Sequence, residues 1–301
     1  MIWYELKMIG NTVLITGVTG YLGCRVAQAL DAAGFRVIGL IRRSSDPFAV
    51  KRAIPKIEFL LAEDSMLSGQ IKDRDVHQVI HCATHYGRTD PNPDRVRETN
   101  VEFPYRLLRQ SIEAGVRTFI NTDTVLNAGI SVYSSTKKDF LALFQTTSDQ
   151  IECINIALDH FYGPGDGNDK FVTDVIRKLL RSVDSIPLTP GGQQRDFTHV
   201  DDVVRAFVTI AKHVPLGHPR FVEIQAGSGR IITIRALIEL IRGTIGNDRT
   251  RLEFGALPYR SNEMMASQMD LQMIHSLGWL PQISLEEGLR SVVAFERERI
   301  L

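Results

Sequence analysis

The chain has 301 residues, and its 35 Lys and Arg residues equal its 35 Asp and Glu residues, so the formal net charge is zero. This balance gives no indication of a nucleic-acid partner or an anionic membrane surface. No apolar run approaches the ~20 residues that span a bilayer, and residues 1–7 lack the basic-then-apolar order of a signal peptide. We therefore expect a cytoplasmic protein with no membrane partner.

The three cysteines do not form a metal-binding or disulfide pattern. Cys24, Cys82 and Cys153 are widely spaced and lie in apolar surroundings. Such thiols are usually buried and unreactive. We therefore expect no metal site.

Residues 13–23 predict a strand, a tight turn and the start of a helix. An apolar run leads into Gly17, Gly20 and Gly23. In dinucleotide-binding proteins the first glycine forms the turn, the second lets the backbone approach the pyrophosphate, and the third allows close helix packing. The phosphates then lie on free N–H groups at the helix start. We expect the following residues to bind a dinucleotide: Gly17, Thr19, Gly20, Tyr21, Leu22 and Gly23.

The second strand, expected over residues 34–41, is followed by Arg42 and Arg43. Proteins that prefer NAD carry an acidic residue near this point, which accepts hydrogen bonds from the adenosine ribose. Guanidinium groups suit a 2′-phosphate through their charge and planar donor geometry. The pair therefore favours NADP(H), although two arginines could also only solvate a strand end.

Further strands are expected over residues 57–61, 76–83 and 118–121, with a helix from Glu98 to Gly115. Regular alternation of strands and helices predicts a parallel sheet covered on both faces. Ligands bind beyond the carboxyl ends of such strands. Residues at these ends are therefore expected in the cofactor site. Cys82, Ala83 and Thr84 are expected near the ribose and nicotinamide. Asp64 is expected near the adenine, although it could also be a plain loop carboxylate.

Tyr133 and Lys137 are four residues apart in a helix-like stretch. This spacing places both side chains on one face of a helix. The ammonium can lower the phenol pKa and bind the cofactor ribose, which would make Tyr133 a proton donor or acceptor near neutral pH. Thr124, at the end of the preceding strand, supplies a hydroxyl that could hold the substrate oxygen.

Together these motifs resemble the extended short-chain dehydrogenase/reductases, in their NAD-dependent epimerase/dehydratase group, which acts on nucleotide sugars. The resemblance rests on Thr16-Gly-x-x-Gly-x-x-Gly23, Tyr133-x-x-x-Lys137, Tyr162-Gly163-Pro164 and 194–203. It implies several further roles. Arg195 and Arg260 would bind the substrate pyrophosphate, and Glu263 would lie near the nucleotide ribose. Asn100 would position Lys137 or a water, and Tyr162 would contact the cofactor. The residues that would contact the substrate are His85, Tyr86, His160 and Phe171.

Residues 80–88, 119–124, 133–140 and 159–166 resemble the CDP-abequose and CDP-paratose synthase group of NADPH-dependent 4-ketoreductases. That group makes 3,6-dideoxyhexoses for bacterial lipopolysaccharide. The family's dehydratases carry Asp-Glu after the catalytic Thr, whereas this chain has Val125-Leu126, which cannot move protons. A dehydratase is therefore not expected. The chain also has Ala157 and His160 where the wider family often has Arg and Asn.

The expected fold is α/β, a Rossmann-type doubly wound parallel sheet with a smaller α/β substrate lobe. Residues 1–161 and 195–226 are expected to form the NADP-binding domain, and residues 162–194 and 227–301 the nucleotide-sugar lobe. Residues 185–192 are expected to form a turn-rich connector, because they contain Pro and Gly.

The expected activity is NADPH-dependent reduction of a nucleotide-linked 4-keto-6-deoxy or 3,6-dideoxy hexose for O-antigen synthesis, with CDP as the expected nucleotide. An epimerase with tightly bound NAD would use the same tyrosine and lysine, and a non-catalytic NADP-binding sensor is a third alternative. The resemblance also implies a homodimer.

Overall fold

The computed structural model describes residues 11–88, 90–213 and 220–300. The N-terminal residues considered for a signal peptide lie outside these ranges. The described residues form two units. The first lies within Met1–Ala157, Val204–Gln225 and Gln272–Trp279, and the second within Leu158–Val203, Ala226–Leu271 and Leu280–Leu301.

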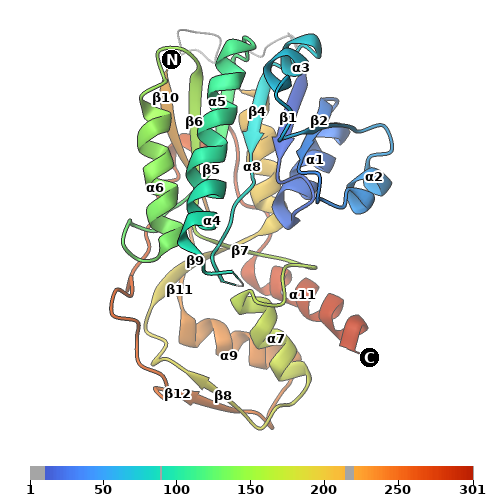
Figure 1. Cartoon of the computed structure of the whole chain (residues 1–301). Helices are drawn as coiled ribbons and strands as arrows, with labels where there is room; N and C mark the ends of the chain where they lie inside the picture. Colours follow the sequence, from blue (N-terminus) through green and yellow to red (C-terminus); the bar gives the residue numbers. More distant parts are fainter. Residues whose placement is uncertain (1–10, 89, 214–219, 301) are drawn as a thin grey trace. The chain divides into compact units, whose positions relative to one another are not determined.

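The first unit is built on a seven-stranded sheet with the strand order β10-β6-β5-β4-β1-β2-β3 (Figure 1). The pairs β1–β2, β2–β3, β1–β4 and β4–β5 are parallel. Six of the strands follow the order 3-2-1-4-5-6 of dinucleotide-binding folds. The strands are β1 (Thr12–Thr16), β2 (Arg36–Ile41), β3 (Glu58–Leu61), β4 (Gln78–His81), β5 (Thr118–Thr124), β6 (Glu152–Leu158) and β10 (Phe221–Ala226).

Helices flank this sheet, with α5 and α6 on one side and α8 on the other (Figure 1). All residues of β1 and β6 are buried, as expected for strands covered on both faces. Phe119, Phe140 and Phe144 form an aromatic centre of the core between the sheet and α6. The helices are α1 (Tyr21–Ala32), α2 (Phe48–Ala53), α3 (Leu67–Asp73), α4 (Pro93–Arg97), the π-helix η1 (Glu98–Glu102), α5 (Phe103–Glu113), α6 (Val132–Gln145), α8 (Val200–Lys212) and α10 (Gln272–Ser276).

The second unit combines two small sheets with three helices. In the larger sheet β9 lies between β7, its parallel neighbour, and β11, its antiparallel neighbour. Ile176, Ile238 and Leu289 are fully buried where the three helices pack together. The elements are β7 (His160–Tyr162), β8 (Ser185–Leu188), β9 (Gln194–His199), β11 (Ile231–Thr233), β12 (Arg251–Phe254), α7 (Phe171–Leu180), α9 (Ile234–Ile245) and α11 (Leu285–Ile300).

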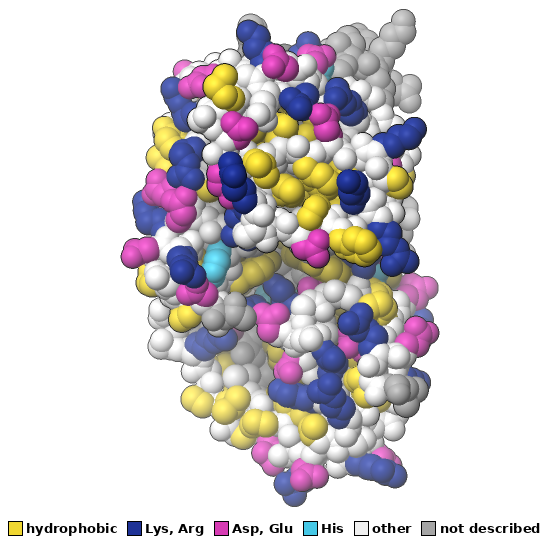
Figure 2. Space-filling model, turned by 45° about the vertical axis from the view of Figure 1, so that its right-hand side comes forward, with side chains coloured by type: hydrophobic (Ala, Val, Ile, Leu, Met, Phe, Trp, Pro, Cys, Tyr) yellow, Lys and Arg dark blue, Asp and Glu magenta, His cyan; other side chains and the backbone are white. Residues whose placement is uncertain are grey.

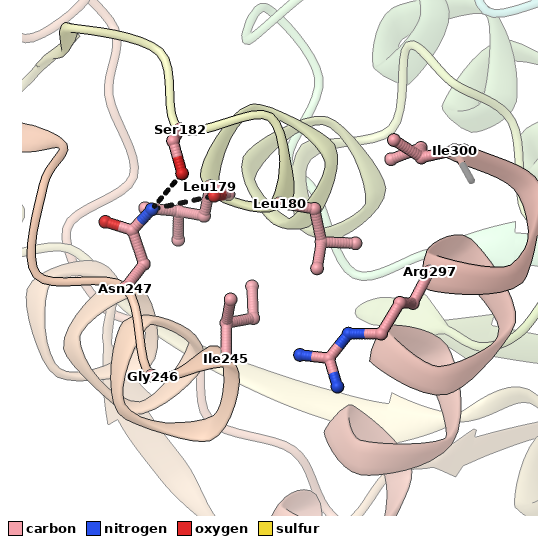
Figure 3. A pocket seen from close by; sticks show the side chains of 8 residues that line it. All are labelled: Leu179, Leu180, Ser182, Ile245, Gly246, Asn247, Arg297 and Ile300. Carbon is pink, nitrogen blue, oxygen red and sulfur yellow. Dashed lines mark hydrogen bonds between the residues drawn. The ribbon is translucent and has the colours of Figure 1, made fainter.

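A hollow of about 300 Å³ lies in the second unit where α7 and α9 end, beside α11 (Figure 3). Asn247 Nδ2 donates a hydrogen bond to the Leu179 carbonyl at 2.7 Å and thereby ties the two helix ends together. Leu180, Ile245 and Arg297 also line the hollow. It contains none of the residues expected to bind cofactor or substrate.

The structure confirms the expected fold class, a Rossmann-like parallel sheet with flanking helices. It differs in two details. Residues 185–188 form strand β8 instead of a turn, because they pair with β12. The unit boundaries also differ: residues 158–161, 195–203 and 226 belong to the second unit, where β9 pairs with β7 and β11, and residues 272–279 belong to the first.

Acidic and basic side chains are spread among each other on the face shown in Figure 2, in line with the balanced charge. None of the helices in the described ranges is long and apolar enough to cross a membrane. Nor do the described residues contain a cluster of three or more His, Cys, Asp or Glu side chains that could hold a metal ion.

Candidate active site

The glycine turn between β1 and α1 is closely packed against the end of β4. Gly17 has a φ of 65°, and a Cβ atom there would lie 2.7 Å from the Ala83 backbone nitrogen. A Cβ atom on Gly23 would collide with the Gly17 carbonyl oxygen. Gly20 is the N-cap of α1 and provides no side-chain cap. The N–H groups of the first helical turn therefore remain available for an anion such as phosphate.

Thr16 links this turn to β4, a contact that sequence reasoning missed. Its Oγ1 accepts hydrogen bonds from the backbone nitrogens of Cys82 and Ala83, both at 3.1 Å. His81 Nδ1 lies 2.8 Å from the same oxygen. Since two N–H groups already occupy the lone pairs of the hydroxyl, Thr16 donates its proton to Nδ1. A polar residue at a strand end, directly before the first glycine, was the available signal.

His81 is therefore a neutral imidazole with its proton on Nε2. The ring is 1% exposed and lies among Phe103, Phe119 and Phe140, at centroid distances of 5.9–6.3 Å. Nε2 has no hydrogen-bond partner among the described residues. Burial, and then the charge of Lys137, hold the pKa of His81 well below its ordinary value. The ring thus fixes the turn without carrying a charge.

Arg42 and Arg43 are exposed just beyond β2. Their backbone nitrogens donate to Ser45 Oγ and Glu63 Oε1 at 3.2 and 3.3 Å. Across the described part of the chain, neither guanidinium group has a hydrogen bond or an ion pair. Asp64 differs, because its two oxygens accept from the Met66 nitrogen and Gln70 Nε2, and these bonds lower its pKa. Asp64 therefore holds its own loop together.

Helix α6 presents the tyrosine and lysine from one end. Ser131 is its N-cap and exchanges hydrogen bonds with Ser134 in a capping box, with N···O distances of 3.0 and 3.1 Å. This fixes the helix start immediately before Tyr133. The Tyr133 phenol shares a hydrogen bond with the Thr124 hydroxyl, and its ring centroid lies 4.9 Å from that of Tyr86. The first unit thus brings these expected site residues together.

Lys137 is 2% exposed, and its ammonium has no hydrogen bond or ion pair with any other described residue. Burial lowers its pKa, while the charge of Asp123 opposes this effect. A buried ammonium without a protein partner is costly unless a ligand supplies one. Lys137 therefore has the properties of a ligand-binding group.

The pKa of Tyr133 is shifted in the direction opposite to the one expected. Burial raises it well above its ordinary value, as do Tyr86 and Asp123, whereas the hydrogen bond from Thr124 and the charge of Arg88 lower it. Lys137, the cation expected to lower it, is not among these groups. A phenol with a raised pKa keeps its proton at neutral pH, which suits a proton donor.

Asn100 lies in η1, a π-helical turn between α4 and α5 of a kind often found at functional sites. Its Oδ1 accepts from the His85 nitrogen at 2.8 Å and from Thr84 Oγ1 at 3.2 Å. Its Nδ2 donates to the His85 carbonyl and to Thr136 Oγ1 at 2.9 and 3.0 Å. Asn100 therefore fastens the loop after β4 to α6 and bonds Thr136, the neighbour of the lysine it was expected to position.

The cysteines are less buried than expected, since only Cys153 is fully buried and Cys24 and Cys82 are partly exposed. Burial nevertheless raises the pKa of each thiol, to about 11 for Cys82 and about 12 for Cys153. Thiols that keep their proton are poor nucleophiles and poor metal ligands.

The second unit contains the residues expected to bind the diphosphate and the ribose. Arg195, whose side chain is 7% exposed, pairs with Glu263 at an Nη2–Oε1 distance of 2.7 Å and also donates to the Gln194 carbonyl. Arg260 is exposed, and no partner of its guanidinium is found in the described ranges. A diphosphate would therefore meet one preorganised and one freely oriented arginine.

His160 and Tyr162 behave differently within the second unit. His160 Nδ1 lies 2.7 Å from an oxygen of the buried Asp159 carboxylate, and its ring centroid lies 5.3 Å from that of Phe197. Tyr162 is 2% exposed and donates its hydroxyl proton to the Leu285 carbonyl at 3.2 Å. Tyr162 thus lies in the core of the second unit, and Phe171 packs against the same core. The cofactor contact expected for Tyr162 stays a prediction.

Comparisons with known proteins agree with this fold. The NAD dependent epimerase/dehydratase family matches residues 13–224. The chain is 29% identical to CDP-abequose synthase of Salmonella typhimurium, with 96% of this chain and 99% of the relative covered. It is 26% identical to UDP-glucuronate 4-epimerase of Thermodesulfobacterium geofontis, with 95% and 96% covered.

Among solved structures, UDP-glucose 4-epimerase of Thermotoga maritima, determined with UDP-glucose, superposes with a TM-score of 0.80. That comparison has 25% sequence identity and covers 96% of this chain and 100% of the other. The family match covers most of the chain, and it includes the glycine turn and the Tyr133 and Lys137 pair. The protein therefore belongs to the NAD dependent epimerase/dehydratase family of enzymes.

Proposed function

We propose that the protein is an NADPH-dependent reductase of a nucleotide-linked 4-keto-6-deoxy or 3,6-dideoxy hexose, with CDP as the nucleotide, and that it serves O-antigen synthesis. The observation that carries the reductase chemistry is the hydrogen bond between Thr124 and Tyr133, with the buried Lys137 four residues further along α6. The similarity to CDP-abequose synthase supports the substrate. Within this proposal the enzyme is a cytoplasmic homodimer.

The residues of the first unit fit a nicotinamide dinucleotide. The uncapped N-terminus of α1, next to Gly20, suits the pyrophosphate. The Lys137 ammonium would bind a ribose hydroxyl, and the exposed guanidinium groups of Arg42 and Arg43 would bind the 2′-phosphate that distinguishes NADP from NAD. When bound, the dinucleotide supplies the hydride for the sugar ketone.

Reduction of a ketone also requires a proton on its oxygen. The Tyr133 hydroxyl would give up its proton as negative charge develops on that oxygen, and the Thr124 hydroxyl would hold the same oxygen by a hydrogen bond. The raised pKa of Tyr133 ensures that the proton is present at neutral pH. Ketone, hydride and proton together give the product alcohol.

In the second unit, Arg195 and Arg260 would bind the nucleotide diphosphate. Arg195 is already held by Glu263, so little side-chain entropy is lost when its guanidinium takes up a phosphate oxygen. His160, oriented by Asp159 through Nδ1, leaves Nε2 to contact a sugar hydroxyl.

A nucleotide-sugar epimerase with bound NAD is the second candidate function, and the similarity to UDP-glucuronate 4-epimerase favours it. An epimerase would regenerate its cofactor in each turnover. The unpartnered guanidinium groups of Arg42 and Arg43 instead favour an exchangeable NADPH. The third alternative, a non-catalytic NADP-binding sensor, would not require the Thr124 and Tyr133 hydrogen bond.

The test uses purified protein, NADPH and CDP-, GDP-, UDP- and dTDP-linked 4-keto-6-deoxy sugars. We expect loss of NADPH absorbance in proportion to the alcohol detected by NMR, with the CDP-linked sugar. Tyr133→Phe should lower kcat by about 10²–10⁴-fold, whereas Tyr105→Phe, on α5, should not. Conversion of ordinary nucleotide sugars without NADPH consumption would establish the epimerase instead.

A further inference from the structure

A buried polar cluster joins the end of β5 to α6. Lys138 Nζ donates hydrogen bonds to Asp123 Oδ2 at 2.8 Å and to the backbone carbonyl of Thr124 at 2.6 Å. Asn155 Nδ2 donates to the same Asp123 oxygen at 3.1 Å, and Asn121 Nδ2 donates to Asn155 Oδ1 at 2.7 Å. We refer to Lys138, Asp123, Asn155 and Asn121 as the Lys138 clamp.

The clamp acts where β5 extends past β4, one of its two neighbouring strands, the other being β6. The pairing of β5 with β4 ends at Asn121, opposite His81, but β5 continues to Thr124. The last three residues of the strand therefore extend beyond β4. The charge-assisted hydrogen bond from Lys138 to the Thr124 carbonyl holds this end of the strand. The side chain of Thr124 in turn hydrogen bonds to Tyr133.

Lys137 and Lys138, which are neighbours on α6, have different roles. Adjacent helix positions point about 100° apart, so Lys138 forms the ion pair with Asp123, whereas Lys137 feels only the charge of that carboxylate. The Asp123 side chain is 0% exposed and that of Lys138 27% exposed. Because a buried carboxylate needs a counter-charge, Lys138 compensates the charge of Asp123. That charge raises the pKa of Tyr133, as Tyr86 does, whereas Arg88, from the same loop after β4, lowers it.

We propose that Lys138 is a positioning residue that acts through Thr124. It holds the end of β5 so that the Thr124 hydroxyl stays hydrogen bonded to Tyr133 and both face the reacting sugar oxygen. This inference rests on the proposed function, because the clamp acts on the pair assigned to protonation. Displacements of about 1 Å at such positions can cost about 10²-fold in rate.

The first test replaces Lys138 with Met. We expect kcat to fall about 10- to 100-fold, while NADPH affinity and the KM for the sugar change by less than about 3-fold, because the proposal assigns Lys138 to neither ligand. Lys138→Arg should recover most of the rate, because it keeps the charge. The matched control is Lys178→Met, which breaks an exposed ion pair with Asp174 of the same 2.8 Å length and should leave kcat unchanged.

The second test asks whether Lys138 works through Thr124. In a Thr124→Val background, Lys138→Met should lower kcat by less than about 2-fold, because the hydroxyl that it positions is already gone. Two losses that simply multiply would overturn the inference.

A third readout does not depend on activity. Crystal structures of the wild type and of Lys138→Met should show the Thr124 and Tyr133 hydrogen bond in the first and its loss in the second. An intact hydrogen bond in the variant would refute the positioning role. If the wild type turns over none of the sugars, the proposed function fails, but this pair of structures still decides whether the clamp positions Thr124.

Discussion

Glu152, the first residue of β6, should destabilise the folded protein as the pH rises through neutrality. Its side chain is 8% exposed, its nearest cation is Arg220 at an Nε–Oε1 distance of 3.7 Å, and its Oε1 accepts no hydrogen bond from the described residues. Burial raises its pKa from 4.5 to about 7, against the opposing charge of Arg220. Such a carboxyl binds its proton more tightly in the folded state than in the unfolded state.

The sign and size of the effect follow from linkage. Between pH 4.5 and about 7 the unfolded chain binds fewer protons at Glu152 than the folded protein does. The free energy of unfolding therefore falls as the pH rises. A pKa difference of about 2.5, at about 1.4 kcal/mol for each whole step, corresponds to about 3 kcal/mol at pH 8. In Glu152→Gln this loss is absent, because the amide does not titrate.

The assay is thermal unfolding of the wild type and Glu152→Gln from pH 4.5 to 8. We expect the difference in midpoint to grow with pH in favour of the variant, by roughly 5–10 °C in total. Glu58→Gln is the control of opposite sign. Although burial opposes it, hydrogen bonds from Arg74 and Arg36 lower the pKa of Glu58, so its removal should cost stability above pH 4.5. A Glu152→Gln difference that stays constant across this range would refute the reasoning.

Two further predictions concern the cofactor site. Replacing Arg42 and Arg43 together by Ala should raise the KM for NADPH by about 10- to 100-fold, the worth of one charge-assisted hydrogen bond, and leave the KM for NADH nearly unchanged. Steady-state kinetics with both cofactors measure this, with the exposed Arg52→Ala as control. An equal effect on both cofactors would contradict the 2′-phosphate assignment. Thr16→Val should lower the free energy of unfolding by about 3 kcal/mol, because it leaves two backbone N–H groups and one imidazole nitrogen without their partner. Denaturant titration measures this loss against that of Thr12→Val on the same strand. Equal losses in the two variants would show that the Thr16 hydroxyl is unimportant.

The parts of the site that could be predicted from the sequence are those set by local spacing. Three glycines between a strand and a helix predict the turn because each position has a steric requirement within a few residues. Tyr133 and Lys137 could be assigned to one helix face because the α-helical period fixes their relation. The alternation of strands and helices likewise predicted the parallel sheet.

Contacts between distant residues could not be predicted in this way. Thr16 and His81 are 65 positions apart, and Arg195 and Glu263 are 68 positions apart. The direction of the Tyr133 pKa shift depends on burial and on Tyr86, neither of which periodicity reveals. Strand β8 was missed because Pro187 and the following Pro and Gly residues are typical of turns, and only its pairing with β12 makes it a strand.

Binding of the cofactor by the buried Lys137 ammonium, as we propose, would link the lifetime of the protein to the supply of that cofactor. A ligand that binds only the folded state stabilises it by about 2.7 kcal/mol at a hundred times its dissociation constant. The cofactor-free protein would keep the cost of burying this charge, which Asp123 offsets only in part, so we expect it to unfold and be degraded more readily than the loaded protein. The amount of enzyme in a cell would then follow the concentration of its dinucleotide, with no regulatory domain involved.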